Sequence, residues 1–426
     1  MDCRSVRGPL NGSSAAPKWR WSSDSIRRSL EALRSQRIGG VLLLLMALAA
    51  LVWANTSPAS YAFVFTEAWH WSAAGPALVF RDVINDGLMS LFFFVVAMEI
   101  KRELTVGELG SVPRAMLPAI AALGGMVVPA ALFLAFTAGG PAAAGWGVPI
   151  ATDIAFCVGV LSLLNQRIPR ALIVFIAALA VFDDVGGILV IACFYGHGID
   201  FGYLALATLV LLVGICAGRA RTEHTWVYVL LGTALWWAIH EAGIHPTIAG
   251  VALGLIVPTV MRRRTAAVSD DSTRSAVTVA AAPLSARYLH ALHAPVTLVV
   301  LPLFALANSG VSLAGMGLAT ATTPVTLGIF VALVIGKPIG ILVPTLLAVR
   351  FGIAPMPGAA TRSQLLGASI CAGIGFTVSL FIGALAYHDA PALLAQAKLG
   401  VLAASAVAGV AGYCMLRWCA RPHGSP

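Results

Sequence analysis

The sequence predicts an all-α polytopic membrane protein with about twelve transmembrane helices. Of its 426 residues, 59% are hydrophobic and only 11% are charged, whereas soluble domains carry about a quarter charged residues. The apolar residues form blocks of about 20, the length that crosses a bilayer core as a helix. The alternating segments of about ten residues that are typical of membrane β-barrels are absent. Together these observations favour membrane-spanning helices.

Twelve apolar blocks are long enough to be candidate spans. They lie near 39–54, 84–99, 115–138, 148–164, 171–194, 201–218, 225–240, 246–260, 294–314, 325–349, 363–386 and 394–416. The seven cysteines form no CxxC motif and lie mostly inside these blocks, so we expect free packing thiols. No His or Cys spacing predicts a zinc site, and we expect no cofactor.

Polar segments divide the chain into three parts. Residues 1–38 read as a basic cytosolic tail with a surface helix near 25–37, because no short apolar region of a cleavable signal follows the first basic residues. Residues 39–416 form the transmembrane domain, interrupted by an internal loop at 261–292. Residues 417–426 form a cytosolic C-terminal tail.

The distribution of basic residues predicts the orientation. If twelve spans alternate from an internal N-terminus, 24 of the 27 Lys and Arg residues fall inside. Only Arg81 and Lys398 fall outside, and Lys337 lies within a span. This is the positive-inside pattern of a protein of the bacterial inner (plasma) membrane with both termini in the cytoplasm. The net charge of +9 is then explained by topology and contact with membrane lipids, and not by nucleic-acid binding.

Two spans carry similar segments and are poor continuous helices. Residues 151–158 in span four and 371–378 in span eleven share Ile, Phe and Val at the same spacing. Because the two spans run in opposite directions, the similarity indicates an inverted repeat. Pro149 and Thr152 interrupt span four, and glycines weaken span eleven. Breaks at matching positions of two repeats predict a binding site at the membrane midplane.

Five ionisable residues lie within the spans: Asp86, Asp153, Asp183, Asp184 and Lys337. Each costs at least about 2.5–3.5 kcal/mol near the bilayer centre, so each is expected to be functional or paired. Four carboxylates against one ammonium group make a negative interior that suits a cation. A negative interior also disfavours an anion as the substrate.

Asp183 and Asp184 are consecutive, so on a helix they point about 100° apart. They therefore cannot form the facing carboxylate dyad of an aspartic protease, and we expect no enzyme. One can bind an ion while the other meets a neighbour. A structural pair, neutralised by Lys337 or by protons, is the alternative.

Asp153 lies at the predicted break of span four, where a carboxylate compensates the exposed N–H groups of helix ends. A cap without ion contact is an equal alternative. Thr152 can add a hydroxyl ligand or bond to its own helix. Lys337 can offset exposed C=O groups of helix ends, and it can pair with Asp183. A purely stabilising counter-charge is at least as good an interpretation of Lys337 as a role in carrying protons.

Further charges lie at the span ends. Asp86 begins span two near the outer side. Four charged residues end it on the cytosolic side, where they can form a charged mouth: Glu99, Lys101, Arg102 and Glu103. His290 and His293 flank span nine, and histidine titrates near physiological pH. For both sets the alternative is ordinary solvated helix ends or interfacial residues.

Several segments in order resemble the NhaA family of sodium/proton antiporters over roughly residues 39–416. They are 84–89 (INDGLM), 98–104 (MEIKREL), 151–156 (ATDIAF), 182–186 (FDDVG), 243–250 (GIHPTIAG), 303–308 (LFALAN), 336–340 (GKPIG) and 373–377 (GIGFT). Each segment alone is weak, whereas the ordered set is specific.

The resemblance implies a twelve-helix antiporter with crossed broken helices in spans four and eleven. It implies that Asp184 is the principal ligand of Na⁺ or Li⁺ and that Asp183 joins it in proton exchange. It further implies that Asp153 and Lys337 neutralise helix ends and that Asp183 pairs with Lys337 when the ion is absent. Internal Na⁺ would leave in electrogenic exchange for external H⁺, which serves sodium and pH homeostasis.

One departure concerns pH sensing. The family often has a glutamate just before the first histidine of the segment 288–293, where this chain has Leu289. A cation channel, or a proton-coupled transporter of another cation on the same scaffold, stays open at this point. A homodimer also stays open.

Overall fold

The computed structural model describes residues 23–70, 77–105, 107–110, 112–137, 139–164, 168–196, 198–259, 283–312, 318–358 and 360–419. Most of the expected N-terminal tail, residues 261–282 of the loop 261–292 and the last residues of the C-terminal tail lie outside these ranges. The described chain is almost entirely helical, as expected from its apolar blocks. The exceptions are strands β1 (Ala68–His70) and β2 (Ala77–Val79), which pair antiparallel.

Within the described residues, eight helices are long and apolar enough to span a membrane. They are Ile38–Thr56, Phe80–Thr105, Arg114–Thr137, Arg170–Phe194, Phe201–Arg219, Leu284–Asn308, Pro324–Arg350 and Pro391–Cys419. The first belongs to α1 (Ser23–Thr56), so the expected surface helix near 25–37 is continuous with the first span. The others include α5 (Val112–Thr137), α7 (Arg170–Phe194), α8 (Phe201–Arg219) and α18 (Pro391–Cys419).

Two further pairs of helices are each bent at a short break, which raises the number of spans to ten if each pair counts as one. One pair is η3 (Pro141–Ile150) with α6 (Ile154–Leu163), bent by 42°. The other is α16 (Arg362–Cys371) with α17 (Phe376–Ala386), bent by 46°. These are the predicted spans four and eleven, and each is broken where the sequence is poor in helix-forming residues.

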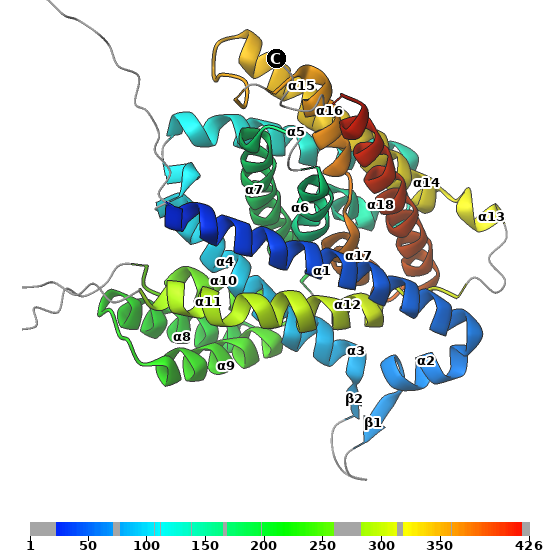
Figure 1. Cartoon of the computed structure of the whole chain (residues 1–426). Helices are drawn as coiled ribbons and strands as arrows, with labels where there is room; N and C mark the ends of the chain where they lie inside the picture. The colour runs from blue at the N-terminus through cyan, green and yellow to red at the C-terminus, as the bar shows by residue number, and fades with distance from the viewer. Residues whose placement is uncertain are drawn as a thin grey trace, which may run out of the picture.

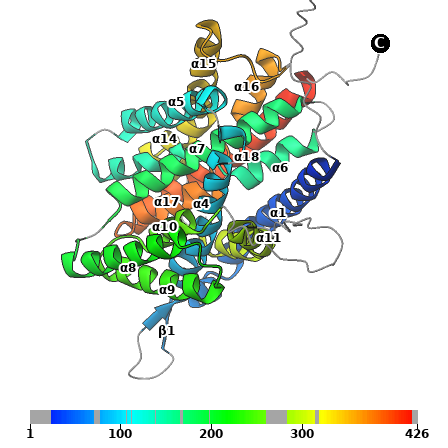
Figure 2. The same cartoon turned by 90° about the vertical axis from the view of Figure 1, so that its left-hand side faces the viewer.

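Two expected spans are shorter helices, α9 (Thr225–Glu241) and α10 (Thr247–Ile256), so the count of twelve stays a prediction. The remaining short elements are α2 (Pro58–Phe65), α3 (Phe80–Asp82), η2 (Glu108–Gly110) and α13 (Leu318–Ala321). Between the first two expected spans, 39–54 and 84–99, the structure places α2 and the β1–β2 hairpin. The hairpin protrudes at one end of the molecule (Figures 1 and 2).

Three long spans contain one widened π turn each. These turns are η1 (Val83–Leu88) before α4 (Met89–Thr105), η4 (Val296–Val300) between α11 (Leu284–Pro295) and α12 (Leu301–Asn308), and η5 (Ala332–Gly336) between α14 (Pro324–Val331) and α15 (Lys337–Arg350). Pro302 and Pro338 are the second residues after the last two turns. Proline has no N–H to bond the preceding turn, which favours the widening.

The helices form two groups around the broken pairs. In Figures 1 and 2, α8 and α9 lie together at one corner of the molecule, away from α15, α16 and α18. Helix α4 packs along α10, and α5 packs along α15. Helix α1 crosses the outside and packs against α6 and α12. The broken pairs meet through a backbone bond of 2.7 Å from Asp153 N to Ile374 O.

The contact of α5 with α15 depends on a pair of facing glycines. A Cβ atom at Gly124 would lie 2.1 Å from the carbonyl oxygen of Gly340, and one at Gly340 would lie 2.3 Å from the oxygen of Gly124. Both obstacles are backbone atoms, which cannot rotate away. The absence of side chains here therefore sets how closely the two helices approach.

Gly124→Ala is expected to lower the thermal unfolding midpoint of the detergent-solubilised protein, with a loss of about 1–3 kcal/mol from overpacking. Gly187→Ala is the matched control, because a Cβ at Gly187 in α7 meets no atom within 4 Å. That control should be neutral or stabilising, since alanine is the better helix former. Equal midpoints for the two variants would contradict the proposed close approach.

Candidate functional site

Helix α7 carries Asp183 and Asp184 at the centre of the molecule, with exposed fractions of 0% and 6%. As their helical spacing requires, the two side chains meet different neighbours. Asp183 Oδ2 lies 2.6 Å from Lys337 Nζ, and both side chains are fully buried. Thr152 Oγ1 lies 2.9 Å from the same Asp183 oxygen. Asp183 is thus paired, while its other oxygen, Oδ1, has no hydrogen-bond partner in the described structure.

Lys337 also donates to the carbonyl oxygen of Ile150, the last residue of η3. Because a helix ends with carbonyl groups that lack partners, a positive charge there is favourable. Lys337 begins α15 directly after the widened turn η5. Its ammonium group therefore joins the end of one broken span to the aspartate of α7.

Asp153 binds the N-terminal ends of helices, where backbone N–H groups lack partners within the helix. Its Oδ1 accepts from Phe156 N at 2.9 Å in the first turn of α6. Its Oδ2 accepts from Thr377 N at 3.2 Å and from Thr377 Oγ1 at 2.6 Å in the first turn of α17. A negative charge is favourable beside the exposed N–H groups of a helix start. One carboxylate thus caps both helices that begin at the breaks.

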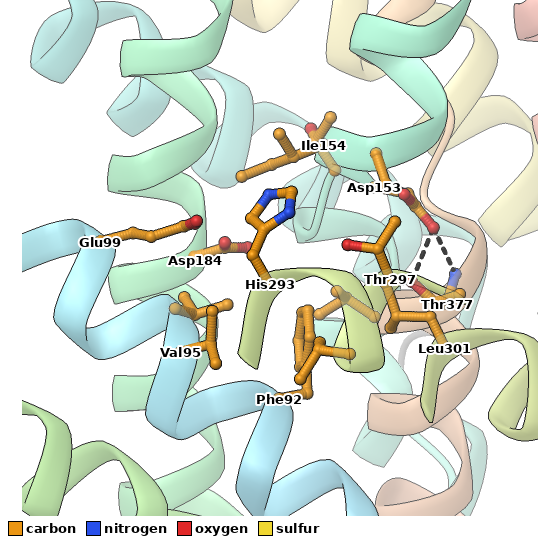
Figure 3. A pocket seen from close by; sticks show the side chains of 15 residues that line it. Phe92, Val95, Glu99, Asp153, Ile154, Asp184, His293, Thr297, Leu301 and Thr377 are labelled. Carbon is orange, nitrogen blue, oxygen red and sulfur yellow. Dashed lines mark hydrogen bonds between the residues drawn. The ribbon is translucent and has the colours of Figure 1, made fainter. Parts of the chain in front are cut away.

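Asp184 lines a pocket of about 80 Å³ between α4, α6, α7, α11 and α17. Figure 3 shows the Asp184 and Glu99 side chains near each other, with His293 beside them and Asp153 farther along the pocket. Thr152, Thr297 and Thr377 add hydroxyl groups, and apolar side chains form the rest of the lining. No hydrogen bond or ion pair holds the Asp184 carboxylate within the described part of the chain. The pocket therefore presents free carboxylate oxygens in a mostly apolar enclosure.

The structure separates the charges that the sequence grouped at the end of span two. Glu99 lines the pocket with Asp184, whereas Arg102 and Glu103 pair with each other at 3.4 Å. Lys101 donates to the carbonyl oxygens of Leu255 and Val257 at 2.7 and 2.6 Å, at the end of α10. Glu99 points away from this surface because a helix turns by about 100° per residue.

The remaining predicted residues lie apart from the pocket or at its edge. Asp86 lies in η1 with its Oδ1 3.4 Å from His245 Nε2. His293 lines the pocket, and His290 is exposed on the same helix. Thr377 binds Asp153, a role that was not predicted from the sequence. Its position could have predicted this role, because Thr377 follows the glycines that break the second span, and a hydroxyl group there can face the break of the first.

These features define a class of protein. A bundle of apolar helices contains a small pocket, buried carboxylates and two broken spans whose breaks meet. Secondary transporters have this organisation, because the ends of discontinuous helices and buried carboxylates bind ions at the membrane midplane. The structure thus describes a multi-pass membrane protein with a site suited to small cations.

Comparison with known proteins specifies the family. Residues 30–416 match the family model of Na⁺/H⁺ antiporter 1, and the chain belongs to this family. It is 46% identical over 415 residues to the Na⁺/H⁺ antiporter NhaA 1 of Myxococcus xanthus, covering 91% of this chain and 92% of that protein. It is 47% identical to the Na⁺/H⁺ antiporter NhaA of Anaeromyxobacter sp., covering 92% of each. The NhaA of Bordetella parapertussis is 43% identical over 90% of this chain and 95% of its own length.

Proposed function

We propose that the protein is a secondary active transporter that exchanges internal Na⁺ or Li⁺ for external H⁺. The unpaired, buried carboxylate of Asp184 beside the Asp183–Lys337 pair carries this proposal. Family membership and the names of the relatives support it. The exchange is electrogenic in this proposal, with more protons entering than sodium ions leaving, and it serves sodium and pH homeostasis.

Competition between cation and protons is the proposed mechanism. A cation at Asp184 gains a second carboxylate oxygen from Asp183, whose Oδ1 is free. Binding there weakens the hold of Lys337 on Asp183, because the ammonium group and the cation repel each other in a medium of low dielectric constant. The proton of Asp184 then leaves, and the ammonium group of Lys337, once its pairing with Asp183 is weakened, gives up a second proton, so that more protons than cations are exchanged. Without the cation, protonation of Asp184 and pairing of Asp183 with Lys337 neutralise the site.

Asp153 and Lys337 support this site by neutralising helix ends, and Thr152 orients Asp183. Their contacts with the broken spans motivate these roles. In the proposal, Glu99 and His293 contribute to the pH response from the pocket wall. Roles of Asp86, Arg102, Glu103 and His290 in a pH response or at a mouth stay predictions, because these residues lie apart from the pocket.

We further propose that α9 and α10 complete twelve spans, that spans four and eleven cross as inverted repeats, and that both termini face the cytoplasm. The similar bends of the two broken spans and the basic residues of the inner segments support this arrangement. The corresponding location is the bacterial inner membrane.

Everted membrane vesicles from antiporter-deficient cells provide the test of function. Adding sodium or lithium to vesicles with a preformed pH gradient is expected to collapse that gradient, because internal protons leave as the cation enters. A response to potassium alone would indicate another cation. Flux that only follows the sodium gradient, without proton coupling, would indicate a channel.

Proton release tests the competition directly. Adding sodium to the purified, weakly buffered protein is expected to acidify the solution, because the cation and the protons share the carboxylates. A pH electrode measures the release, with choline at the same ionic strength as the control. No release at any value across roughly pH 6 to 9 would overturn competition as the mechanism.

A further inference from the structure

Side chains outside the segment η3 bond its backbone at several positions. It is a ten-residue 3₁₀ helix with non-helical backbone angles at Gly145, a type of helix whose hydrogen bonds are poorer than those of an α-helix. Its last residue, Ile150, accepts from Lys337, and Thr152 follows two residues later. The position of η3 therefore places Thr152 and the carbonyl oxygen to which Lys337 donates, and both Thr152 and Lys337 are partners of Asp183.

Two tyrosine hydroxyl groups hold the first half of η3. Tyr387 Oη donates to Ala142 O at 2.6 Å, and Tyr195 Oη donates to Ala144 O at 2.8 Å. Tyr195 Oη also accepts from Gly147 N at 3.3 Å. Tyr195 and Tyr387 are 8% and 2% exposed, so these bonds are shielded from water. The two hydroxyl groups thus tie the backbone of η3 to residues outside it.

The glycines of η3 make room for this contact. A Cβ atom at Gly145 would lie 2.1 Å from Tyr387 Oη, and one at Gly147 would lie 2.8 Å from Tyr195 Oη. Ser379 Oγ adds a bond of 2.7 Å to Val148 O in the second half. The segment is thus fixed along its whole length by α17 and by the residues that follow α7 and α17.

Each tyrosine lies one residue beyond a helix that carries part of the ion site. Tyr195 follows α7, which carries Asp183 and Asp184, and Tyr387 follows α17, which carries Thr377. Because an α-helix is a stiff rod, fixing η3 at these ends fixes its distance from the carboxylates. We propose that Tyr195 and Tyr387 are positioning residues, which clamp η3 so that Ile150 O and Thr152 stay in register with Lys337 and Asp183. This inference rests on the proposed ion site.

The clamp does not depend on pH in the neutral and moderately alkaline range. Burial raises the pKa of Tyr195 to about 12, and burial likewise raises the pKa of Tyr387. A hydroxyl group donates while it is protonated, which is the state below its pKa. Loss of the clamp should therefore change cation binding by the same factor at each pH in this range.

The experiment compares Tyr195→Phe, Tyr387→Phe and the double variant with the wild-type protein in proteoliposomes. Phenylalanine keeps the ring and removes only the hydroxyl group. The apparent KM for sodium of the double variant is expected to rise roughly 5-fold or more at a nearly unchanged maximal rate, since each lost bond weakens placement of the site. The lithium-to-sodium ratio of KM values should also change, because ligand distances distinguish ions of different size.

Tyr228→Phe is the matched control. Tyr228 lies in α9, away from η3, and is 2% exposed. Its hydroxyl group donates to one backbone carbonyl oxygen, that of Thr222, at 3.2 Å. Its KM values should stay at wild-type level, with a comparable change in thermal midpoint. Unchanged KM values and lithium-to-sodium ratio in a folded double variant would overturn the clamp. Asp184→Asn in the same assay tests the ion site separately, because retained exchange there would refute the site itself.

Discussion

Asp184→Asn is expected to abolish exchange while leaving the protein folded. Asparagine has nearly the shape of aspartate but no negative charge, so the pocket loses its main attraction for a cation. A pair of unit charges about 4 Å apart contributes roughly 4 kcal/mol at an effective dielectric constant near 20. Cation affinity should therefore fall by roughly 10³-fold. The variant also has no carboxylate there to carry a proton, so both halves of the exchange stop.

Sodium-dependent collapse of a pH gradient in everted vesicles measures this loss. Asp200→Asn is the control, because Asp200 is an exposed residue that caps α8 through Gly202 N at 2.7 Å, far from the pocket. Its exchange should equal that of the wild-type protein. Exchange by Asp184→Asn at a wild-type KM for sodium, with the protein shown to be inserted, would exclude Asp184 as the principal ligand.

Lys337→Met is expected to be the most destabilising substitution at the site. The Lys337 and Asp183 side chains are both fully buried, and their charged atoms are 2.6 Å apart. Removing one partner leaves an uncompensated charge in the interior, which costs about 3–5 kcal/mol. The Ile150 carbonyl oxygen loses its donor as well. Thermal unfolding of the detergent-solubilised protein should show a marked fall in the midpoint.

A double variant distinguishes the loss of stability caused by an unpaired charge from the loss caused by altered packing. Lys337→Met combined with Asp183→Asn removes both charges, so most of the lost stability should return. Lys101→Met serves as the control, because Lys101 caps α10 but belongs to no ion pair in the described structure. Its midpoint should fall only slightly. A double variant as unstable as Lys337→Met would mean that the ion pair does not account for the loss.

Candidate site residues could be found from the sequence because charge is costly in an apolar span. Asp153, Asp183, Asp184 and Lys337 stand out among apolar neighbours, and their positions needed no tertiary information. The two breaks were predicted for a similar reason, because proline and glycine weaken a helix wherever it packs. The exact extent of the breaks and the π turns depended on packing between helices.

The position of Glu99 shows that the helical periodicity of the sequence does not predict which neighbour a side chain faces. Its sequence neighbours Lys101, Arg102 and Glu103 suggested a common charged mouth, but the rotation of α4 places Glu99 alone in the pocket of Asp184. Which side of a helix faces which neighbour depends on how all the helices pack. In this chain most residues of a span are apolar, so the hydrophobic pattern does not distinguish the face that packs on other helices from the face that contacts lipid.

By itself, the sequence determined the class of this protein, most of its spans and the charged residues that a cation transporter needs. These follow from transfer free energies, which belong to each residue and hardly depend on its partners. The sequence left open whether Asp183 pairs with Lys337 and whether Asp153 caps a helix, and the tertiary structure decided both. It also placed Asp184 and Glu99 in the same pocket. It also decided that Tyr195 and Tyr387 hold η3. Such contacts join residues far apart in the chain. They form only when the packing of the helices brings the two groups to hydrogen-bonding distance and angle, which a local sequence pattern does not predict.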